Sequence, residues 1–159
     1  MPEESTRPEK PTRGLLDTSV VIDLERPGTR EDLPDELCVS AITMAELAAG
    51  PHATDDSARR AVRVERLQGA ESTFDQLPFD LATARAYGRV YAAVTAAGRN
   101  ARGRRTLDML IAATSLAHAL PLYTSNPGDF AGLENLLDIV AVPPPAGPDG
   151  PPAESESGP

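Results

Sequence analysis

Residues 13–24 read RGLLDTSVVIDL, and this stretch decides how the rest of the chain is interpreted. The apolar run at 14–16 predicts a short buried strand, and the apolar spacing at 19–25 predicts a helix that stops before Pro27. Asp17 stands at the junction of the two. Its carboxylate has two interpretations at this point: a cap for the following helix, or the first ligand of a metal site.

The same alternation of short apolar runs and helical segments continues along the chain. Pro78 places one of the expected strands at a sheet edge, because proline cannot donate a ladder hydrogen bond. We expect further strands at 36–42, 74–79, 120–126 and 136–140, and helices at 43–50, 57–73, 80–97 and 106–119. Strands that alternate with helices predict an α/β fold around a parallel sheet.

Two of these helices have apolar faces that can be assigned from spacing. On 57–73 we expect Ala61, Val64 and Leu67 to face the core, with Arg59, Arg60, Arg63 and Arg66 around the other side. On 80–97 the expected apolar stripe consists of Leu81, Ala84, Tyr87, Tyr91 and Val94.

The two ends of the chain differ in composition from the middle. Residues 1–13 have no large apolar residue after Met1, and ten of the seventeen residues in 143–159 are Pro or Gly. Such segments bury too little apolar surface to offset the entropy of ordering them. We expect a single domain at 14–142, a flexible N-terminal extension at 1–13 and a disordered tail at 143–159.

The formal net charge of -9, from 24 acidic and 15 basic residues, disfavours a uniformly basic nucleic-acid-binding surface. Fourteen of the basic residues are Arg, and they cluster near 59–66 and 99–105. Either these clusters are local phosphate contacts or they reflect a codon bias. One Cys excludes an internal disulfide, and no apolar run approaches the roughly 20 residues of a membrane span. Without a signal peptide, the expected location is cytoplasmic.

Four carboxylates stand out by their surroundings: Asp17, Glu46, Asp108 and Asp129. Each alone has an ordinary interpretation as a cap, a solvated helix residue, a helix-dipole partner or a turn residue. However, the neighbours of Glu46 in ITMAELAAG and of Asp108 in TLDMLIAAT are mostly apolar, and buried carboxylates need partners. Ligands of α/β sheets bind at the carboxyl ends of the strands. Oxygen-only ligands there favour Mg²⁺ or Mn²⁺.

Four segments, LLDTSVVIDL, ITMAELAAG, LDMLIAATSLAHAL and LYTSNPGDF, resemble the motifs of PIN domains in their order. The resemblance covers about residues 14–141 and is closest to the VapC-type toxins of bacterial toxin–antitoxin pairs. It implies a three-layer α/β/α sandwich with a mostly parallel central sheet, and a Mg²⁺-dependent endoribonuclease. The four carboxylates match the family's acidic metal ligands and catalytic residues.

The resemblance also implies roles for polar neighbours and for partners. Thr18 and Ser19 match the hydroxyl residues after the first Asp, and Thr124 and Asn126 match the polar positions before the last one. Substrate RNA is expected near these four residues, and near Arg104 and Arg105 because they precede Asp108 by only a few positions. A homodimer and a cognate VapB-type antitoxin are further expectations.

Three other functions are open to a sequence of this kind. A haloacid-dehalogenase-type phosphatase also begins with an Asp at a strand end, but it needs a second Asp where this chain has Ser19. A PIN-like nuclease in RNA processing would share all four carboxylates. A non-catalytic PIN-like module that binds RNA or protein would have no reason to keep them.

Overall fold

The protein, described by a computed structural model over residues 11–26 and 30–143, has five strands in one sheet of order β3-β2-β1-β4-β5. All four strand pairs are parallel. Residues 1–10 and 144–159, which make up most of the expected extension and tail, lie outside the described residues. The strands are β1 (Arg13–Leu16), β2 (Glu36–Ser40), β3 (Asp75–Leu77), β4 (Leu122–Thr124) and β5 (Ile139–Ala141).

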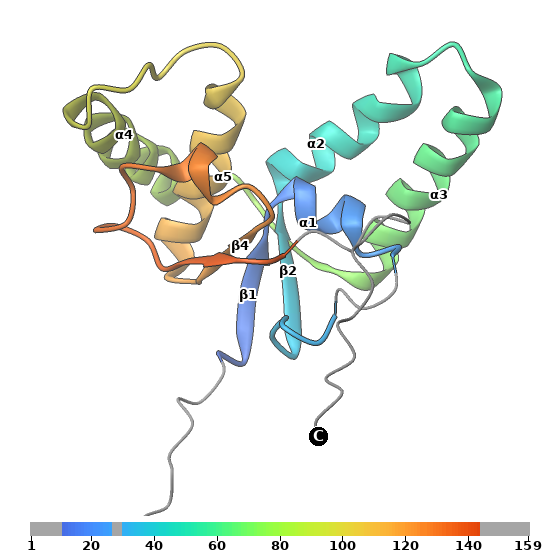
Figure 1. Cartoon of the computed structure of the whole chain (residues 1–159), viewed down its shortest axis with the longest axis horizontal. Helices are drawn as coiled ribbons and strands as arrows, with labels where there is room; N and C mark the ends of the chain where they lie inside the picture. Colours follow the sequence, from blue (N-terminus) through green and yellow to red (C-terminus); the bar gives the residue numbers. More distant parts are fainter. Residues whose placement is uncertain (1–10, 27–29, 144–159) are drawn as a thin grey trace, which may run out of the picture.

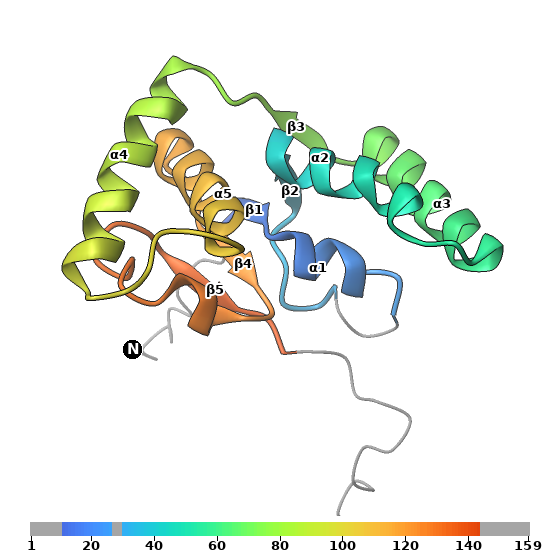
Figure 2. The same cartoon turned by 90° about the horizontal axis from the view of Figure 1, so that it is seen from above.

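Helices cover both faces of the sheet, so the predicted three-layer α/β/α sandwich is confirmed (Figure 1). The helices are α1 (Thr18–Asp23), α2 (Ala41–Ala49), α3 (Ser57–Thr73), α4 (Leu81–Ala96) and α5 (Arg105–His118), with 3-10 turns η1 (Gly50–Ala53) and η2 (Pro127–Phe130). The pair α4 and α5 lies on one side of the sheet, and α1, α2 and α3 lie on the other (Figures 1 and 2).

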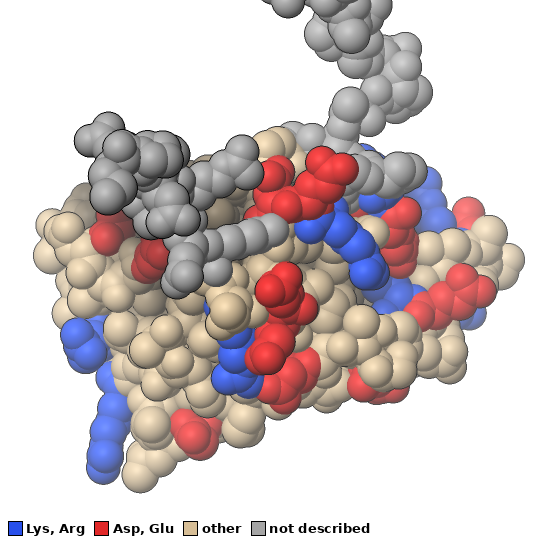
Figure 3. All heavy atoms as spheres, turned by 90° about the horizontal axis from the view of Figure 1, so that it is seen from below, with Lys and Arg blue, Asp and Glu red and all other residues tan. Residues whose placement is uncertain are grey.

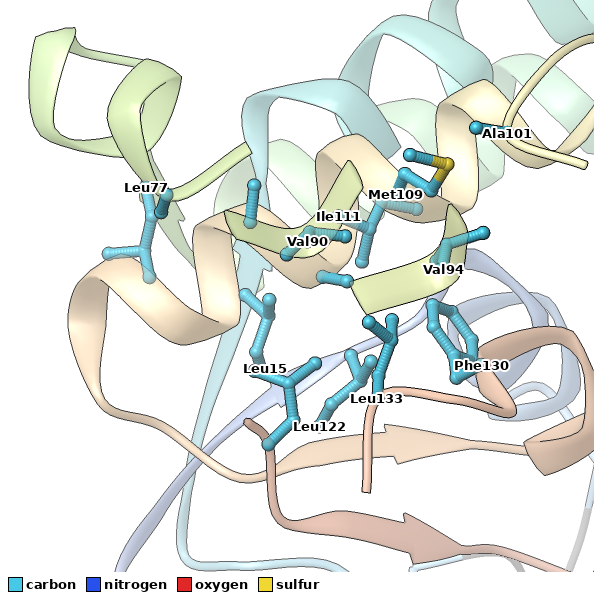
Figure 4. Packing of buried hydrophobic residues seen from close by; sticks show 14 of the residues in the cluster. Leu15, Leu77, Val90, Val94, Ala101, Met109, Ile111, Leu122, Phe130 and Leu133 are labelled. Atoms are coloured by element: carbon cyan, nitrogen blue, oxygen red, sulfur yellow. The ribbon is translucent and has the colours of Figure 1, made fainter. Parts of the chain in front are cut away.

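Two separate apolar cores result from the alternation of side chains along the strands. Leu15 of β1 packs into the core beneath α4 and α5, which also contains Val90 and Ile111 (Figure 4). The next residue, Leu16, packs into the opposite core with Tyr123 of β4 and with residues of α1, α2 and α3. The central strand is therefore buried on both faces, as is typical of parallel sheets.

Gly14 is required by close packing across β1. A Cβ at this position would collide with the ring of Tyr123 and lie 2.9 Å from Pro34 Cγ. The absence of a side chain lets Tyr123 lie against β1, where the aromatic ring is 2% exposed.

The apolar faces predicted for the two long helices are partly wrong. On α4, Leu81 is 67% exposed and Tyr91 is 41% exposed, and Ala84 is also exposed. The buried face instead carries Thr83, Ala86, Val90 and Val94, with Tyr87 half-buried. This helix is rich in Ala on every side, so small residues that approach α5 closely are buried in place of the larger ones.

Arg side chains account for the difference on α3. Ala61 and Val64 are exposed, whereas Arg63 and Arg66 are half-buried and lie on the side that faces α2. Leu67 is partly buried, as expected. The long apolar stems of Arg can cover neighbouring surface while their guanidinium groups bond backbone and carboxylate oxygens.

Strand ends also differ from the sequence expectations by a few residues. β2 ends at Ser40, not at residue 42, because the Ser40 hydroxyl accepts a hydrogen bond from Thr43 N and caps α2. β5 starts at Ile139, because the N–H groups of Leu136 and Leu137 bond Leu133 O in a turn. β3 lies at the sheet edge, as Pro78 predicted.

Charge is mixed on the face at the amino ends of the strands. Acidic and basic side chains are interspersed there among uncharged ones (Figure 3). Arg13 of β1 forms ion pairs with Asp75 and Glu36 on this part of the sheet. Among residues 11–26 and 30–143, no helix has both the length and the apolar character needed to cross a membrane.

Candidate functional site

The candidate site lies at the carboxyl ends of β1 and β4, where the strand order changes direction. From β1 the chain adds β2 and β3 on one side, and β4 and β5 on the other. Such a topological switch point leaves a crevice between the flanking loops, and it is the usual place for ligands in open α/β sheets. Figure 2 looks onto this end of the sheet, with α2 and α3 on one side of the β1–α1 junction and α5 on the other.

Asp17 is held by three hydrogen-bond donors at this junction. Its Oδ1 atom accepts from Thr18 N at 2.9 Å, and its Oδ2 atom accepts from both Ser19 Oγ and Thr124 Oγ1 at 2.9 Å. The first bond caps α1, so the cap interpretation is correct. A carboxylate has about two acceptor sites on each oxygen, so Oδ2 is filled and Oδ1 keeps one site.

Glu46 of α2 is positioned by a chain of hydroxyl groups. Its Oε1 atom accepts from Thr18 Oγ1 at 2.9 Å. Because the Thr18 proton is used there, Thr43 Oγ1, 3.0 Å away, is the donor to Thr18. Thr43 in turn accepts from Ser40 Oγ at 3.3 Å, and Ser40 accepts from Thr43 N. The chain runs in one direction and ends on an ionised carboxylate, which strengthens each bond in it.

Asp108 and Asp129 complete the acidic group from the α4 and α5 side. Asp108 lies in the first turn of α5 and Asp129 in η2. The two line one hollow together with Arg104 and Arg105. The structure thus brings all four predicted carboxylates to one end of the sheet: Asp17 at the end of the central strand, Glu46 from α2, and the other two from α5 and η2.

The electrostatics of the group show how closely these carboxylates interact. Burial raises the pKa of Asp108 to about 7, and the negative charges of Asp17, Asp129 and Glu46 add to the effect. Burial also raises the pKa values of Asp17 and Glu46, although hydrogen bonds from Ser19 and Thr18 respectively oppose the shift. Burial is therefore the main cause of this pattern, and repulsion among the carboxylates adds to it, while the charge of Arg105 partly offsets it at Asp108.

The remaining predicted residues lie around the group. Thr18, Ser19 and Thr124 bond Asp17 or Glu46, as described above. Arg105 is the first residue of α5, and its charge lowers the pKa of Asp108. Arg104 and Asn126 are exposed, and the backbone N–H of Asn126 donates to Thr124 Oγ1 at 3.0 Å. The Asn126 side chain makes no hydrogen bond with another described residue.

Some positioning residues were missed or misjudged from the sequence. Asp23 of α1, which the sequence analysis did not single out, accepts a hydrogen bond from Ser125 Oγ at 3.1 Å. Ser125 N also donates to Ser19 Oγ at 3.2 Å, so this serine ties the loop after β4 to α1. Ser40 could have been recognised, because a serine after a strand and before an apolar helix is typical of a cap.

The donor set fits a hard divalent cation. Within the described part of the chain, no three acidic, His or Cys side chains are arranged to enclose a metal ion by themselves. A Mg²⁺ ion at this site would therefore be bound directly through one or two carboxylates and would keep several waters. The free acceptor site on Asp17 Oδ1 favours such an ion, and so do the burial and the neighbouring negative charges that raise the pKa of Asp108.

Comparison with known proteins gives consistent matches over most of the chain. A family model described as PIN domain matches residues 14–134. Ribonuclease VapC5 of Mycobacterium tuberculosis is 34% identical over 136 residues, covering 83% of this chain and 96% of that protein. Ribonuclease VapC8 of the same species is 41% identical over 102 residues, covering 64% of this chain and 89% of that protein.

Solved structures show the same arrangement of elements. The structure of VapBC-5 from Mycobacterium tuberculosis, described as a member of the VapBC family of toxin–antitoxin systems, matches with a TM-score of 0.70 and 32% identity. The match covers 84% of this chain and 99% of that one. FitAcB from Neisseria gonorrhoeae matches with a TM-score of 0.64 and 28% identity, covering 79% and 95% respectively.

Proposed function

Since the chain belongs to the PIN-domain family and resembles its VapC ribonucleases most clearly, we propose that it is an endoribonuclease that acts as the toxin of a toxin–antitoxin pair. One observation carries this proposal: the four carboxylates gather at the switch point of the sheet, with Asp17 fixed by three donors. A metal-dependent hydrolase of phosphodiesters uses such a preorganised acidic group to hold its cation.

We assign binding of a divalent cation, Mg²⁺ or Mn²⁺, to Asp17, Glu46, Asp108 and Asp129. When bound, the ion would lower the pKa of a water and neutralise charge on the phosphate. Thr18 links the two carboxylates on its side, since its N–H bonds Asp17 and its hydroxyl bonds Glu46. This fixes their spacing before substrate arrives.

The α5 side of the site supplies positive charge next to the carboxylates. Arg104 and Arg105 lie beside Asp108 and Asp129 in the same hollow. Guanidinium groups bind phosphate oxygens through two parallel bonds, so these arginines would hold the RNA backbone next to the carboxylates. Asn126 is exposed just before the 3-10 turn that holds Asp129 and would present an amide to the same backbone.

A cleavage assay tests the proposed activity. Purified protein should cut a mixed single-stranded RNA substrate in the presence of Mg²⁺, and an excess of EDTA should stop the reaction. Asp17→Asn should reduce the rate on the order of 100-fold or more, because it replaces the carboxylate that would bind the cation with a neutral amide. Asp138→Asn is the matched control: it removes the same charge from an exposed residue just before β5, at the other end of the sheet. Equal activity of the two variants would contradict the proposal.

The toxin assignment needs a separate experiment in cells. Induced expression should stop growth, and Asp17→Asn should relieve the arrest. A small protein encoded beside the gene should also relieve it when it is co-expressed and should co-purify with the chain. Cleavage in vitro without growth arrest would favour a nuclease in RNA processing.

A further inference from the structure

Two hollows with arginine walls flank the carboxylate group. The α3-side hollow, about 320 Å³, is lined by Thr18 and Glu46 on the inner wall and by Arg63 and Arg66 on the outer wall. The loop-side hollow, about 380 Å³, is lined by Asp108 and Asp129 and by Arg102, Arg104 and Arg105. Each hollow shares its inner wall with the acidic group, and Figure 2 places α3 and the loop between α4 and α5 on opposite sides of the β1–α1 junction.

The arginines of the α3-side hollow are fixed in place. Arg63 donates from Nη1 to Gly50 O at 2.8 Å. Arg66 binds both oxygens of Glu25, at 3.2 and 3.1 Å. A guanidinium has five donors, so Arg63 retains four for a ligand. Because Glu25 neutralises Arg66, Arg63 supplies most of the positive charge available to a ligand in this hollow.

The arginines of the loop-side hollow have the opposite character. Arg102 and Arg104 are exposed, and neither guanidinium bonds another residue of the described part of the chain. Arg105 is half-buried beside Asp108. Three cations stand here against two carboxylates, so this hollow attracts anions more strongly than the α3-side hollow does.

The shape of the site restricts which nucleic acid can use both hollows. Asp17 is 5% exposed, so a phosphate that approaches it must come close to the end of the sheet between the two hollows. A flexible single strand can do this, whereas the phosphates of a duplex lie on the outside of a wide, stiff helix. Neither hollow has an aromatic side chain among its described lining residues, so contacts to the backbone take the place of base stacking.

From these observations, and resting on the proposed function, we infer that one single-stranded RNA crosses the site from the α3-side hollow to the loop-side hollow. The phosphate on one side of the scissile bond binds Arg63, and the phosphate on the other side binds Arg102 and Arg104. The scissile phosphate then lies over the carboxylates.

Salt dependence of RNA binding tests this path without requiring cleavage. The probe is a fluorescent, mixed-sequence single-stranded RNA of about 12 nucleotides, bound by Asp17→Asn protein in Mg²⁺ and followed by anisotropy. Each phosphate contact contributes about 0.7 to the slope of log affinity against log salt for single strands. Adding Arg63→Gln should reduce the slope by about 0.7. Adding Arg102→Gln with Arg104→Gln should also reduce it by about 0.7, because these two arginines bind one phosphate, and the two reductions should add.

Matched control variants show whether the slope depends on the position of the removed arginine or only on the net charge of the protein. Arg85→Gln and Arg89→Gln remove the same charges from exposed positions on α4 that line neither hollow, and they should leave the slope nearly unchanged. Arg63→Lys keeps the charge while losing the fork geometry, so the slope should be retained. Thermal melts of each variant verify folding, which matters for Arg63 because of its bond to Gly50.

The binding experiment and the cleavage assay can fail independently, so failure of the RNA path can be told apart from failure of the proposed function. Slopes that fall no more than those of the α4 controls, or a duplex of equal length that binds as well as the single strand, would overturn the path even if the wild-type protein cleaves RNA. Reduced and additive slopes with no wild-type cleavage would support the path and reject the nuclease. If the slope falls only for the variants of one hollow, the result would also reject a strand that spans both hollows.

Discussion

Replacing Asp108 by Asn should stabilise the metal-free protein while it damages the proposed activity. Burial and the charges of Asp17, Asp129 and Glu46 raise the pKa of Asp108 from 3.8 to about 7. At pH 8 without a cation, the ionised carboxylate therefore opposes folding. Asn keeps nearly the same shape and removes the charge, so the repulsion disappears.

The size of the effect follows from the pKa difference. A shift of about 3 units at about 1.36 kcal/mol per unit corresponds to roughly 4 kcal/mol. Asp108 is only half-buried, so solvent screening reduces this to about 1–2 kcal/mol. The folded state binds more protons than the unfolded state between pH 3.8 and about 7. The contribution of Asp108 is therefore fully present below pH 3.8 and is lost as the pH rises through about 7.

Denaturant unfolding in EDTA, at about pH 8 and again at about pH 5, measures this effect. Asp108→Asn should gain about 1–2 kcal/mol over wild type at the higher pH, and the gain should be smaller at the lower one. The control Asp138→Asn changes an exposed carboxylate at the other end of the sheet, and it should change the free energy of unfolding by less than about 0.5 kcal/mol. If Asp108→Asn gains no more than this control, or gains equally at both pH values, the electrostatic account of the site is wrong.

Three further predictions concern the site and the sheet. Mg²⁺ at about 100 times its dissociation constant should stabilise the wild type by about 2.7 kcal/mol in thermal melts, and Asp17→Asn should gain less. Thr18→Val removes the bond that lowers the pKa of Glu46, so the pH profile of cleavage should shift to higher pH. Gly14→Ala should cost about 1–3 kcal/mol because its Cβ meets Tyr123, whereas Gly88→Ala on α4, where a Cβ meets nothing within 4 Å, should stabilise by about 0.5–1 kcal/mol.

The sequence was sufficient for the sheet and for the gathering of the carboxylates. Short apolar runs that alternate with helices allow few arrangements other than a parallel sheet, and all strand ends of such a sheet lie at one edge. Asp17, Glu46 and Asp129 each follow a strand or lie within about two turns of its end, so their convergence is a consequence of topology. Whether a cation binds there is still a prediction.

The orientation of α3 and α4 was beyond the reach of sequence periodicity. Spacing placed Val64 inward and Arg63 outward, but the carbonyl of Gly50 offers Arg63 a partner that only the fold reveals. On α4, Thr83 is buried because Asp80 accepts its hydroxyl and caps the helix, while the larger Leu81 lies outside. On α3 a hydrogen bond to another element, and on α4 a local capping bond, accompany the inward face, and hydrophobic patterns record neither kind of bond.

The capping role of Asp17, together with its proposed role as a metal ligand, would explain why an aspartate suits the end of β1. Capping α1 uses one acceptor site of Oδ1, and Ser19 and Thr124 fill Oδ2. These bonds hold the carboxylate plane rigid and leave a single acceptor site, on Oδ1, for a ligand. A serine would cap the helix equally well but would lack the charge that attracts a cation. The longer side chain of glutamate would lose the bond to Thr18 N that fixes the direction of the remaining site. A short carboxylate therefore meets both requirements, and the hydroxyl groups on α1 and β4 determine where its last acceptor site points.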